Sequence, residues 1–204
     1  MIPHNQGSSF AWLSTGIAGA GTTSAVADPA EAPEPGAVLG GVDCAGAGTF
    51  DCAQLTYAFV VPDGHHTVRF DFNFLSAEFP EYFGEGYPFN DRFAVALASP
   101  TFSFPNISFD ENGAEININN ALFTDDDCED FDGTGFDIDT GVGSCDAGAT
   151  GLLGTIAPVA PGETVTLTFT LAEEGDALYD SAVMIDNLET TEATVDDPET
   201  SDCD

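Results

Sequence analysis

The chain has 204 residues, and its 36 Asp and Glu against two Arg and no Lys give a formal net charge of −34. So acidic a surface repels phosphate backbones and anionic membranes, which argues against nucleic-acid binding. The length fits one domain, 43% hydrophobic content with 17 Phe supplies a core, and no apolar run is long enough to span a membrane.

Short strands separated by turns account for most of the chain. The segment Ser8–Thr15 predicts a first strand, and the Gly-, Ala- and Pro-rich residues 16–50 predict a long surface loop. Apolar residues at every second position then predict further strands near Leu55–Val61, Val68–Phe74, Phe93–Leu97, Ile107–Phe109, Ile116–Ile118, Val165–Leu171 and Ser181–Leu188. No segment of helical length has a 3.6-residue apolar period, so an all-β fold is expected.

The expected architecture is an antiparallel β-sandwich of jelly-roll type with long acidic and Gly/Ala-rich loops. It occupies residues 1–189 as a single domain. Residues 190–204 are rich in Thr, Asp and Glu, which predicts a disordered acidic tail or linker.

The five cysteines favour an exported protein with two local disulfides. Cys44 and Cys52 lie in a Gly-rich loop, and Cys128 and Cys145 bracket an acidic loop, so we expect the pairs 44–52 and 128–145. Cys203 is left over in the tail as a candidate for pairing with another chain. The competing interpretation is that all the cysteines are reduced in a cytosolic protein.

The segment Asp176–Asn187 has the pattern of a metal-binding strand. Asp180 lies in a turn, and Asp186 closes an apolar run in which a carboxylate needs a cation or hydrogen-bond donors. Since cationic side chains are almost absent, a hard metal ion is the more available partner. Alternatively, Asp186 accepts backbone N–H groups at the end of a strand.

A second acidic segment lies between two predicted core strands and contains Glu78, Glu81, Asn90 and Asp91. Loop and strand oxygens of this kind suit Ca²⁺, which takes six to eight oxygen ligands. We therefore predict that one Ca²⁺ ion is bound by Glu78, Asn90, Asp91, Asp180 and Asp186. The alternative is an ion pair between Arg92 and Glu78 or Glu81.

Enzymatic activity is not expected. The three histidines lie in polar surroundings, and no Gly-x-Ser-x-Gly elbow is present. Glycoside hydrolysis usually needs an aromatic cleft, and Trp12 is the only Trp. Carbohydrate binding stays open, because Tyr57, Tyr82, Tyr87 and Tyr179 are available for sugar stacking.

Several motifs resemble the choice-of-anchor L domain family. They are the segments Phe72–Tyr82, Phe89–Asp91, Asn106–Asp110, Gly148–Leu152 and Glu174–Asn187. The resemblance runs from about Ser8 to Leu188 and is nearest to the versions with long acidic loops from myxobacteria. It implies a β-sandwich module of a secreted or surface-anchored bacterial protein.

The combined prediction is a calcium-stabilised structural or adhesive module, secreted or on the cell surface. Its expected partners are cell-surface or matrix components, including glycans or copies of itself. Two alternatives stay open at this point: a carbohydrate-binding module, and a self-assembling fibre or surface-layer subunit in which the strand Ser8–Thr15 exchanges between chains.

Overall fold

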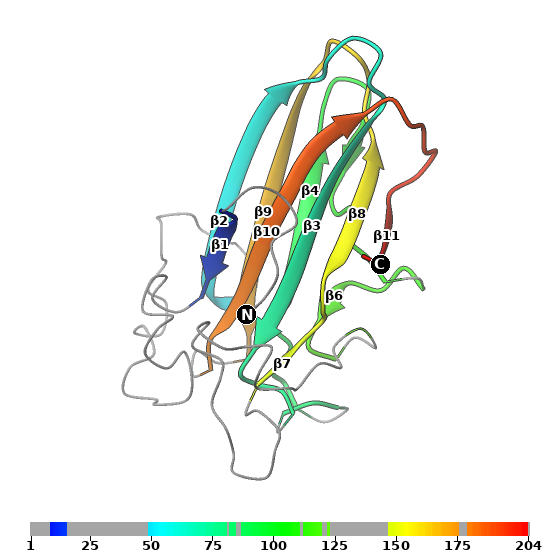
Figure 1. The fold of residues 1–204 in the computed structure, drawn as a ribbon. Coiled ribbons are helices and arrows are strands. Elements are labelled where there is room, and N and C mark those ends of the chain that lie inside the picture. Colours follow the sequence, from blue (N-terminus) through cyan, green and yellow to red (C-terminus); the bar gives the residue numbers. More distant parts are fainter. Residues whose placement is uncertain are drawn as a thin grey trace.

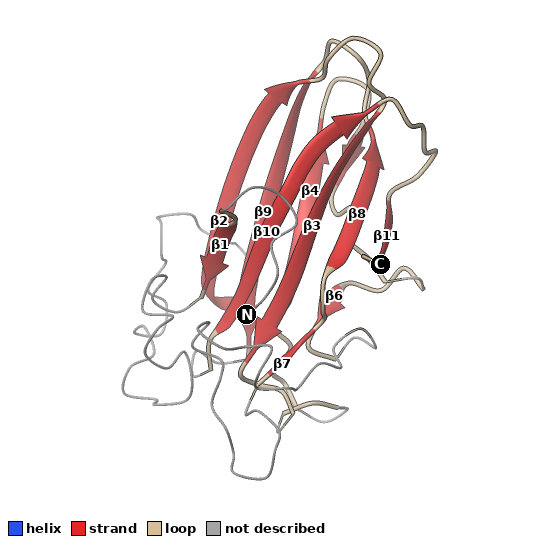
Figure 2. Ribbon diagram, viewed as in Figure 1, coloured by secondary structure: helices blue, strands red, loops and turns tan. Residues whose placement is uncertain are grey.

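The computed structural model describes residues 9–15, 49–80, 82–84, 87–110, 112–119, 122, 147–175 and 179–203. Two antiparallel sheets pack face to face, and none of the described residues is helical (Figures 1 and 2). The predicted all-β antiparallel sandwich is therefore confirmed.

The first sheet has the order β1-β10-β3-β8-β11, with the short β7 paired to β3. The strands are β1 (Ala11–Ser14), β3 (Thr67–Ser76), β7 (Gly148–Ala149), β8 (Leu153–Pro158), β10 (Ser181–Thr191) and β11 (Glu199–Asp202). β1 pairs only with the first half of β10, from Ala182 to Ile185.

The second sheet has the order β2-β9-β4-β5, with the short β6 paired to β4. Its strands are β2 (Thr49–Val60), β4 (Arg92–Ala98), β5 (Ser103–Phe104), β6 (Ile116–Asn117) and β9 (Thr164–Glu174). β9 lies between β2 and β4, so β2 forms one margin of this sheet (Figure 1).

The core lies between the sheets and is built from the predicted alternating rows. Phe70, Phe72 and Phe74 of β3 face Phe93 and its row on β4, and all are fully buried. The rings of Phe72 and Phe93 are 4.8 Å apart between centroids, a favourable contact distance for an aromatic pair. Because strand side chains alternate, the same pleat sends the intervening residues outward.

The C-terminal residues differ from the prediction of a disordered tail. β10 continues to Thr191, and β11 pairs with β8. The physical reason is that the margin of β8 offers open backbone groups, which β11 satisfies. The Thr200 hydroxyl also hydrogen-bonds that of Thr155 at 2.8 Å, and the Cys203 N–H donates to the Leu152 carbonyl at 3.0 Å.

Candidate functional site

The ends of β1, β3 and β9 and the starts of β4 and β10 lie towards the lower end of the sandwich (Figure 1). Buried residues with oxygen-bearing side chains occur at these strand ends. Each polar residue lies two positions from the nearest residue of an apolar core row, after it at the ends of β1, β3 and β9 and before it at the starts of β4 and β10. We call this set the polar layer: Thr15, Ser76, Asp91, Glu173 and Ser181, all of which are buried.

Two carboxylates of the polar layer oppose each other on neighbouring strands. The ladder between β4 and β9 pairs Arg92 with Ala172, and the Asn90 N–H donates to the Glu174 carbonyl two residues further along. Asp91 and Glu173 therefore lie opposite each other, with 0% and 2% of their surfaces exposed. Cβ atoms of such opposed pairs are about 5 Å apart, so two buried carboxyl groups share one small volume.

Hydroxyl groups link these carboxylates to the other sheet. The Ser181 hydroxyl donates to Asp91 Oδ2 at 2.6 Å, and the backbone N–H of Glu174 donates to Asp91 Oδ1 at 3.0 Å. The Thr15 hydroxyl donates to Glu173 Oε1 and accepts from the Ser181 N–H at 2.9 Å. Thr15, at the end of β1, thus joins the two sheets.

A glycine turn places Asp91 in the layer. Gly175 follows β9 with a φ of +102°, in the left-handed region that favours glycine. A Cβ atom there would lie 2.8 Å from the Pro88 carbonyl oxygen and 2.8 Å from the Phe89 ring. This close approach holds the segment before β4 against the end of β9, which sets the position of Asp91.

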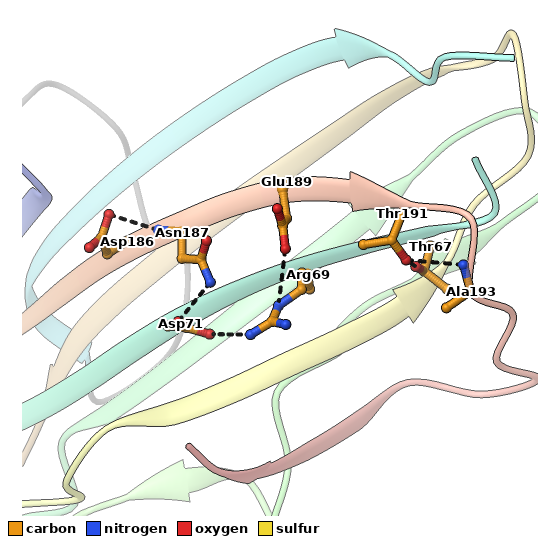
Figure 3. Close-up of polar contacts among 8 residues, drawn as sticks. All are labelled: Thr67, Arg69, Asp71, Asp186, Asn187, Glu189, Thr191 and Ala193. Carbon is orange, nitrogen blue, oxygen red and sulfur yellow. Dashed lines mark hydrogen bonds and ion pairs between the residues drawn. The ribbon is translucent and has the colours of Figure 1, made fainter. Parts of the chain in front are cut away.

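Both arginines contact other carboxylates. Arg92 lies 2.8 Å from Glu174 and 3.7 Å from Glu115, while Glu81, one of the two partners in the alternative prediction, lies outside the described residues. Arg69 lies on the outer face of the first sheet, 3.3 Å from Asp71 and 3.7 Å from Glu189 (Figure 3). Each guanidinium group therefore lies close to two carboxylates, those of Asp71 and Glu189 for Arg69 and those of Glu115 and Glu174 for Arg92.

Asp71 is a further buried carboxylate, and it was not among the predicted ligands. The Asp71 side chain is fully buried. Its Oδ1 accepts a hydrogen bond from Arg69 Nη2, and its Oδ2 accepts one from Asn187 Nδ2 at 3.0 Å (Figure 3). Asn187 lies at a bulge of β10 with a φ of +53°. Burial raises the pKa of the nearby Cys203 thiol to about 11, and the negative charge of Asp71 and a hydrogen bond to it add to the rise.

The structure divides the five predicted calcium ligands between two places. Glu78, Asn90, Asp91 and Asp180 belong to segments at the end that carries the polar layer. Glu78 is buried beside Ser76, whose hydroxyl accepts its N–H at 3.1 Å, and the carbonyl of Asp180 accepts the Ala77 N–H.

Asn90 and Asp186 point elsewhere. Asn90 accepts a hydrogen bond from Asn119 at 2.9 Å. Asp186 lies opposite Asp71 on the outer face, and its Oδ1 accepts the Asn187 N–H at 2.7 Å, as in the alternative interpretation of a strand-end acceptor (Figure 3). Because five residues of β10 correspond to about 17 Å, Asp186 does not reach an ion bound near Ser181.

Four other positions named in the predictions lie outside the described residues. They are Glu81, Cys44, Cys128 and Cys145. Cys52 is disulfide-bonded, but its partner is not in the described part, so the predicted 44–52 and 128–145 pairings stay predictions. Cys203 is a free cysteine.

Three of the four tyrosines gather near the polar layer. The rings of Tyr82 and Tyr179 are 5.2 Å apart, and their hydroxyl groups are 3.3 Å apart. Tyr87 lies edge-on to Tyr82 at 5.9 Å and is exposed. Tyr57 lies on β2, away from this group.

Within the described residues, no group of three or more His, Cys, Asp and Glu side chains is already arranged to hold a metal ion. Ca²⁺ also accepts hydroxyl, carbonyl and water oxygens, so a carboxylate pair with neighbouring hydroxyls still fits a hard cation. Glu173 was not among the predicted ligands. It occupies the next inward position after the row of Val165, Leu167, Phe169 and Leu171, so this row could have pointed to it.

The model of the choice-of-anchor L domain family matches residues 13–189. The chain belongs to this family. The match covers the sandwich from β1 through most of β10 and ends before β11. The comparison with curated proteins found no match, and neither did the comparison with solved structures. Among the described residues, no helix is long and apolar enough to cross a membrane.

Membership of this family indicates a bacterial module of a secreted or surface protein and agrees with a non-enzymatic, all-β domain.

Proposed function

We propose that the chain is an extracellular or cell-surface structural and adhesive module whose sandwich is stabilised by Ca²⁺ at the polar layer. Family membership supports the surface location. The observation that carries the calcium proposal is the opposed, buried pair Asp91 and Glu173 in a chain of net charge −34.

Elementary electrostatics gives this pair two stable states. Two carboxylates in one small buried volume do not both stay ionised unless a cation lies between them, because like charges and burial both penalise the charged form. The alternative is a shared proton, as in carboxyl dyads. Outside the cell Ca²⁺ is abundant, and Asp91, Glu173 and Glu78 with the hydroxyls of Thr15 and Ser181 offer the oxygens that it prefers.

The calcium site would also lock the sandwich mechanically. Thr15 directly follows β1, Ser181 begins β10, Asp91 directly precedes β4, and Glu173 is the penultimate residue of β9. An ion among them joins both sheets at one end, which resists separation of the sheets under tension. This is the property that an adhesive module on a cell surface needs.

The test measures the melting temperature of the wild type and two variants in about 2 mM CaCl₂ and in EDTA. This calcium concentration lies above the Kd range of extracellular calcium sites. The wild type and D186N are expected to melt higher in calcium. D91N is expected to lose that difference, because it removes a charge from the layer. If the wild type melts at the same temperature in both buffers, or if D186N but not D91N loses the difference, the proposed site is wrong.

A second candidate function is carbohydrate binding by the cluster of Tyr82, Tyr87 and Tyr179. The exposed Tyr87 ring beside Tyr82 favours it, since aromatic faces next to hydroxyl groups suit sugar rings. A glycan array probed with the wild type and with Y87A tests it. Binding that Y87A abolishes supports the function, and the absence of any binding removes it.

A further inference from the structure

The sandwich is open along one side, where β2 extends beyond β1. Leu55, Tyr57 and Phe59 of β2 pair with Phe169, Leu167 and Val165 of β9, all of which face the core. Paired residues share a face, so this row of β2 also points between the sheets. Leu55 and Tyr57 are nevertheless 36% and 49% exposed, whereas their partners on β9 are buried.

The cause is the short length of β1. Among the described residues it pairs with β10 only as far as Ile185, and the register of β10 against β3 shifts at the bulge just beyond that point. Beyond the bulge, the margin of β10 from Leu188 to Thr191 has no partner strand on that side among the described residues. In Figure 1, β1 lies in front of the lower part of β2, and no described strand of the first sheet lies in front of its upper part.

The two features form one groove. A hollow of about 300 Å³ is lined by Phe10, Leu55, Tyr57, Phe169, Ile185 and Leu188, with Asp186 and Asn187 at its edge. Its floor is the apolar row of β2, and one wall is the open backbone of β10. An extended strand in line with β1 would hydrogen-bond the open backbone of β10 and would also cover the exposed side chains of β2. Every second side chain of that strand would pack on Leu55 and Tyr57.

Charge decides which kind of strand fits. A second copy of this chain brings another net charge of −34, so its approach is opposed by strong repulsion. Asp186 lies at the edge of the hollow, and two glutamates follow it: Glu189 on β10, which also pairs with Arg69 at 3.7 Å, and Glu192 just after β10. Outward-pointing side chains of a bound strand would lie near these carboxylates, which favours Lys and Arg there.

We propose that this groove binds an extended segment of a partner protein with apolar side chains at alternate positions and Lys or Arg between them. The segment adds a strand to the first sheet next to β10 and completes the cover of β2. The proposal adds a partner to the adhesive role above, but it does not rest on calcium, since the polar layer lies at the other end of β10.

The test measures binding of a synthetic peptide of about nine residues in which Lys alternates with Val and Leu, long enough to pair with the free part of β10. Fluorescence anisotropy is recorded at about 150 mM salt, where unspecific attraction is largely screened. Two control peptides have the same composition in two separate blocks, or Glu in place of Lys. Only the alternating Lys peptide is expected to bind.

Matched variants locate the site. Tyr57 faces the groove, and Val60 lies on the opposite face of the same strand with 63% exposure, so Y57D and V60D place the same charge on the two sides of β2. Y57D is expected to weaken binding at least about tenfold, which corresponds to about 1.4 kcal/mol, and V60D to leave it unchanged. Both positions are exposed, and circular dichroism checks that both variants fold.

Several results would overturn the proposal. Equal binding of the block peptide, or equal loss in V60D, would mean that the peptide is attracted only by the charged surface. A dimer in light scattering that Y57D dissolves would assign the groove to a second copy. Tighter peptide binding after deletion of residues 1–8 would assign it to the chain's own N-terminal segment. Repeating the assay in EDTA separates this proposal from the calcium site, because peptide binding is expected to persist there.

Discussion

Two of the buried carboxylates of this sandwich, Asp71 and Asp91, are stabilised in different ways. Asp71, on the outer face of the first sheet, has the Arg69 guanidinium and the Asn187 amide as donors. Asp91, between the sheets, has the Ser181 hydroxyl and the Glu174 N–H, and it lies opposite a second carboxylate, Glu173. The first site contains its own counter-charge.

This difference shows how a chain with two arginines distributes its cations. One arginine serves the outer carboxylate, and the other lies beside Glu174 at the surface of the second sheet. In the layer between the sheets, the Ser181 and Thr15 hydroxyls and the Glu174 N–H donate to the carboxylates, and the proposed Ca²⁺ would supply the positive charge there. Stability at Asp71 should therefore be insensitive to calcium, whereas stability at Asp91 should depend on it.

The largest change is expected for D91A. It leaves the Ser181 hydroxyl and the Glu174 N–H buried without their acceptor, at a cost of about 1–3 kcal/mol for each group. Urea unfolding in calcium should show a free energy of unfolding lower by about 2–5 kcal/mol than in the wild type. A loss below about 1 kcal/mol would mean that water reaches the layer and that Asp91 is not buried in solution.

A large effect on chemical reactivity is expected at Cys203, which reports on the Asp71 site. Burial first, and then the charge of Asp71 and its hydrogen bond, raise the thiol pKa to about 11 from a reference of 9.0. Since only the thiolate is alkylated, iodoacetamide at pH 8 should react about a hundredfold more slowly than with a free thiol.

The same assay in D71N should show faster alkylation, because the charge of Asp71 is removed while the burial remains. Mass spectrometry after timed quenching gives both rates. If the wild type reacts as fast as a free cysteine does, the thiol is not buried against Asp71.

A smaller change is expected from R69A. The guanidinium is 40% exposed, so solvent screening reduces its interaction with the buried Asp71, and a loss of about 1 kcal/mol is expected. The loss should be the same in calcium and in EDTA, in contrast to that of D91N. A double-mutant cycle with D71N measures the coupling, and a coupling that changes with calcium would contradict the separation of the two sites.

The smallest effect concerns an exposed carboxylate remote from both sites. Hydrogen bonds from Thr101, and further ones from Ser99, lower the pKa of Glu163 below its reference of 4.5. Its stabilising contribution is therefore present above pH 4.5 and is lost as the pH falls through the lowered pKa. The melting temperatures of the wild type and E163Q should differ slightly at pH 7 and converge towards pH 3, and a gap that widens in acid would contradict this.

The sequence predicted the strands with clear alternation, because β3, β4, β9 and β10 each bury one row of side chains. Asp91, one of the predicted calcium ligands, lies in the polar layer. Glu173 of the same layer was not among the predicted ligands, although the inward row of β9 leads to it two residues after Leu171. Extending each apolar row by one inward position would have revealed the polar layer.

Other features could not be read from local patterns. The pairing of β11 with β8 depends on which strand margin is open in the assembled sheet, so a Thr- and Asp-rich segment looked disordered. Asp186 was predicted to join the other ligands because it lies close to Asp180 in the sequence. In the sheet, however, the strand pleat points its side chain to the outer face. The burial of Asp71 likewise depends on Arg69 and Asn187, which come from two strands.

The most direct test of the central claim is the number of calcium ions bound per chain, measured by native mass spectrometry. Spectra are recorded at neutral pH with trace calcium and after EDTA, for the wild type, D91N and D186N. The account predicts one calcium ion on the wild type and on D186N, removed by EDTA and absent from D91N. A folded wild-type monomer that carries no calcium, or a D91N variant that keeps it, would contradict the claim.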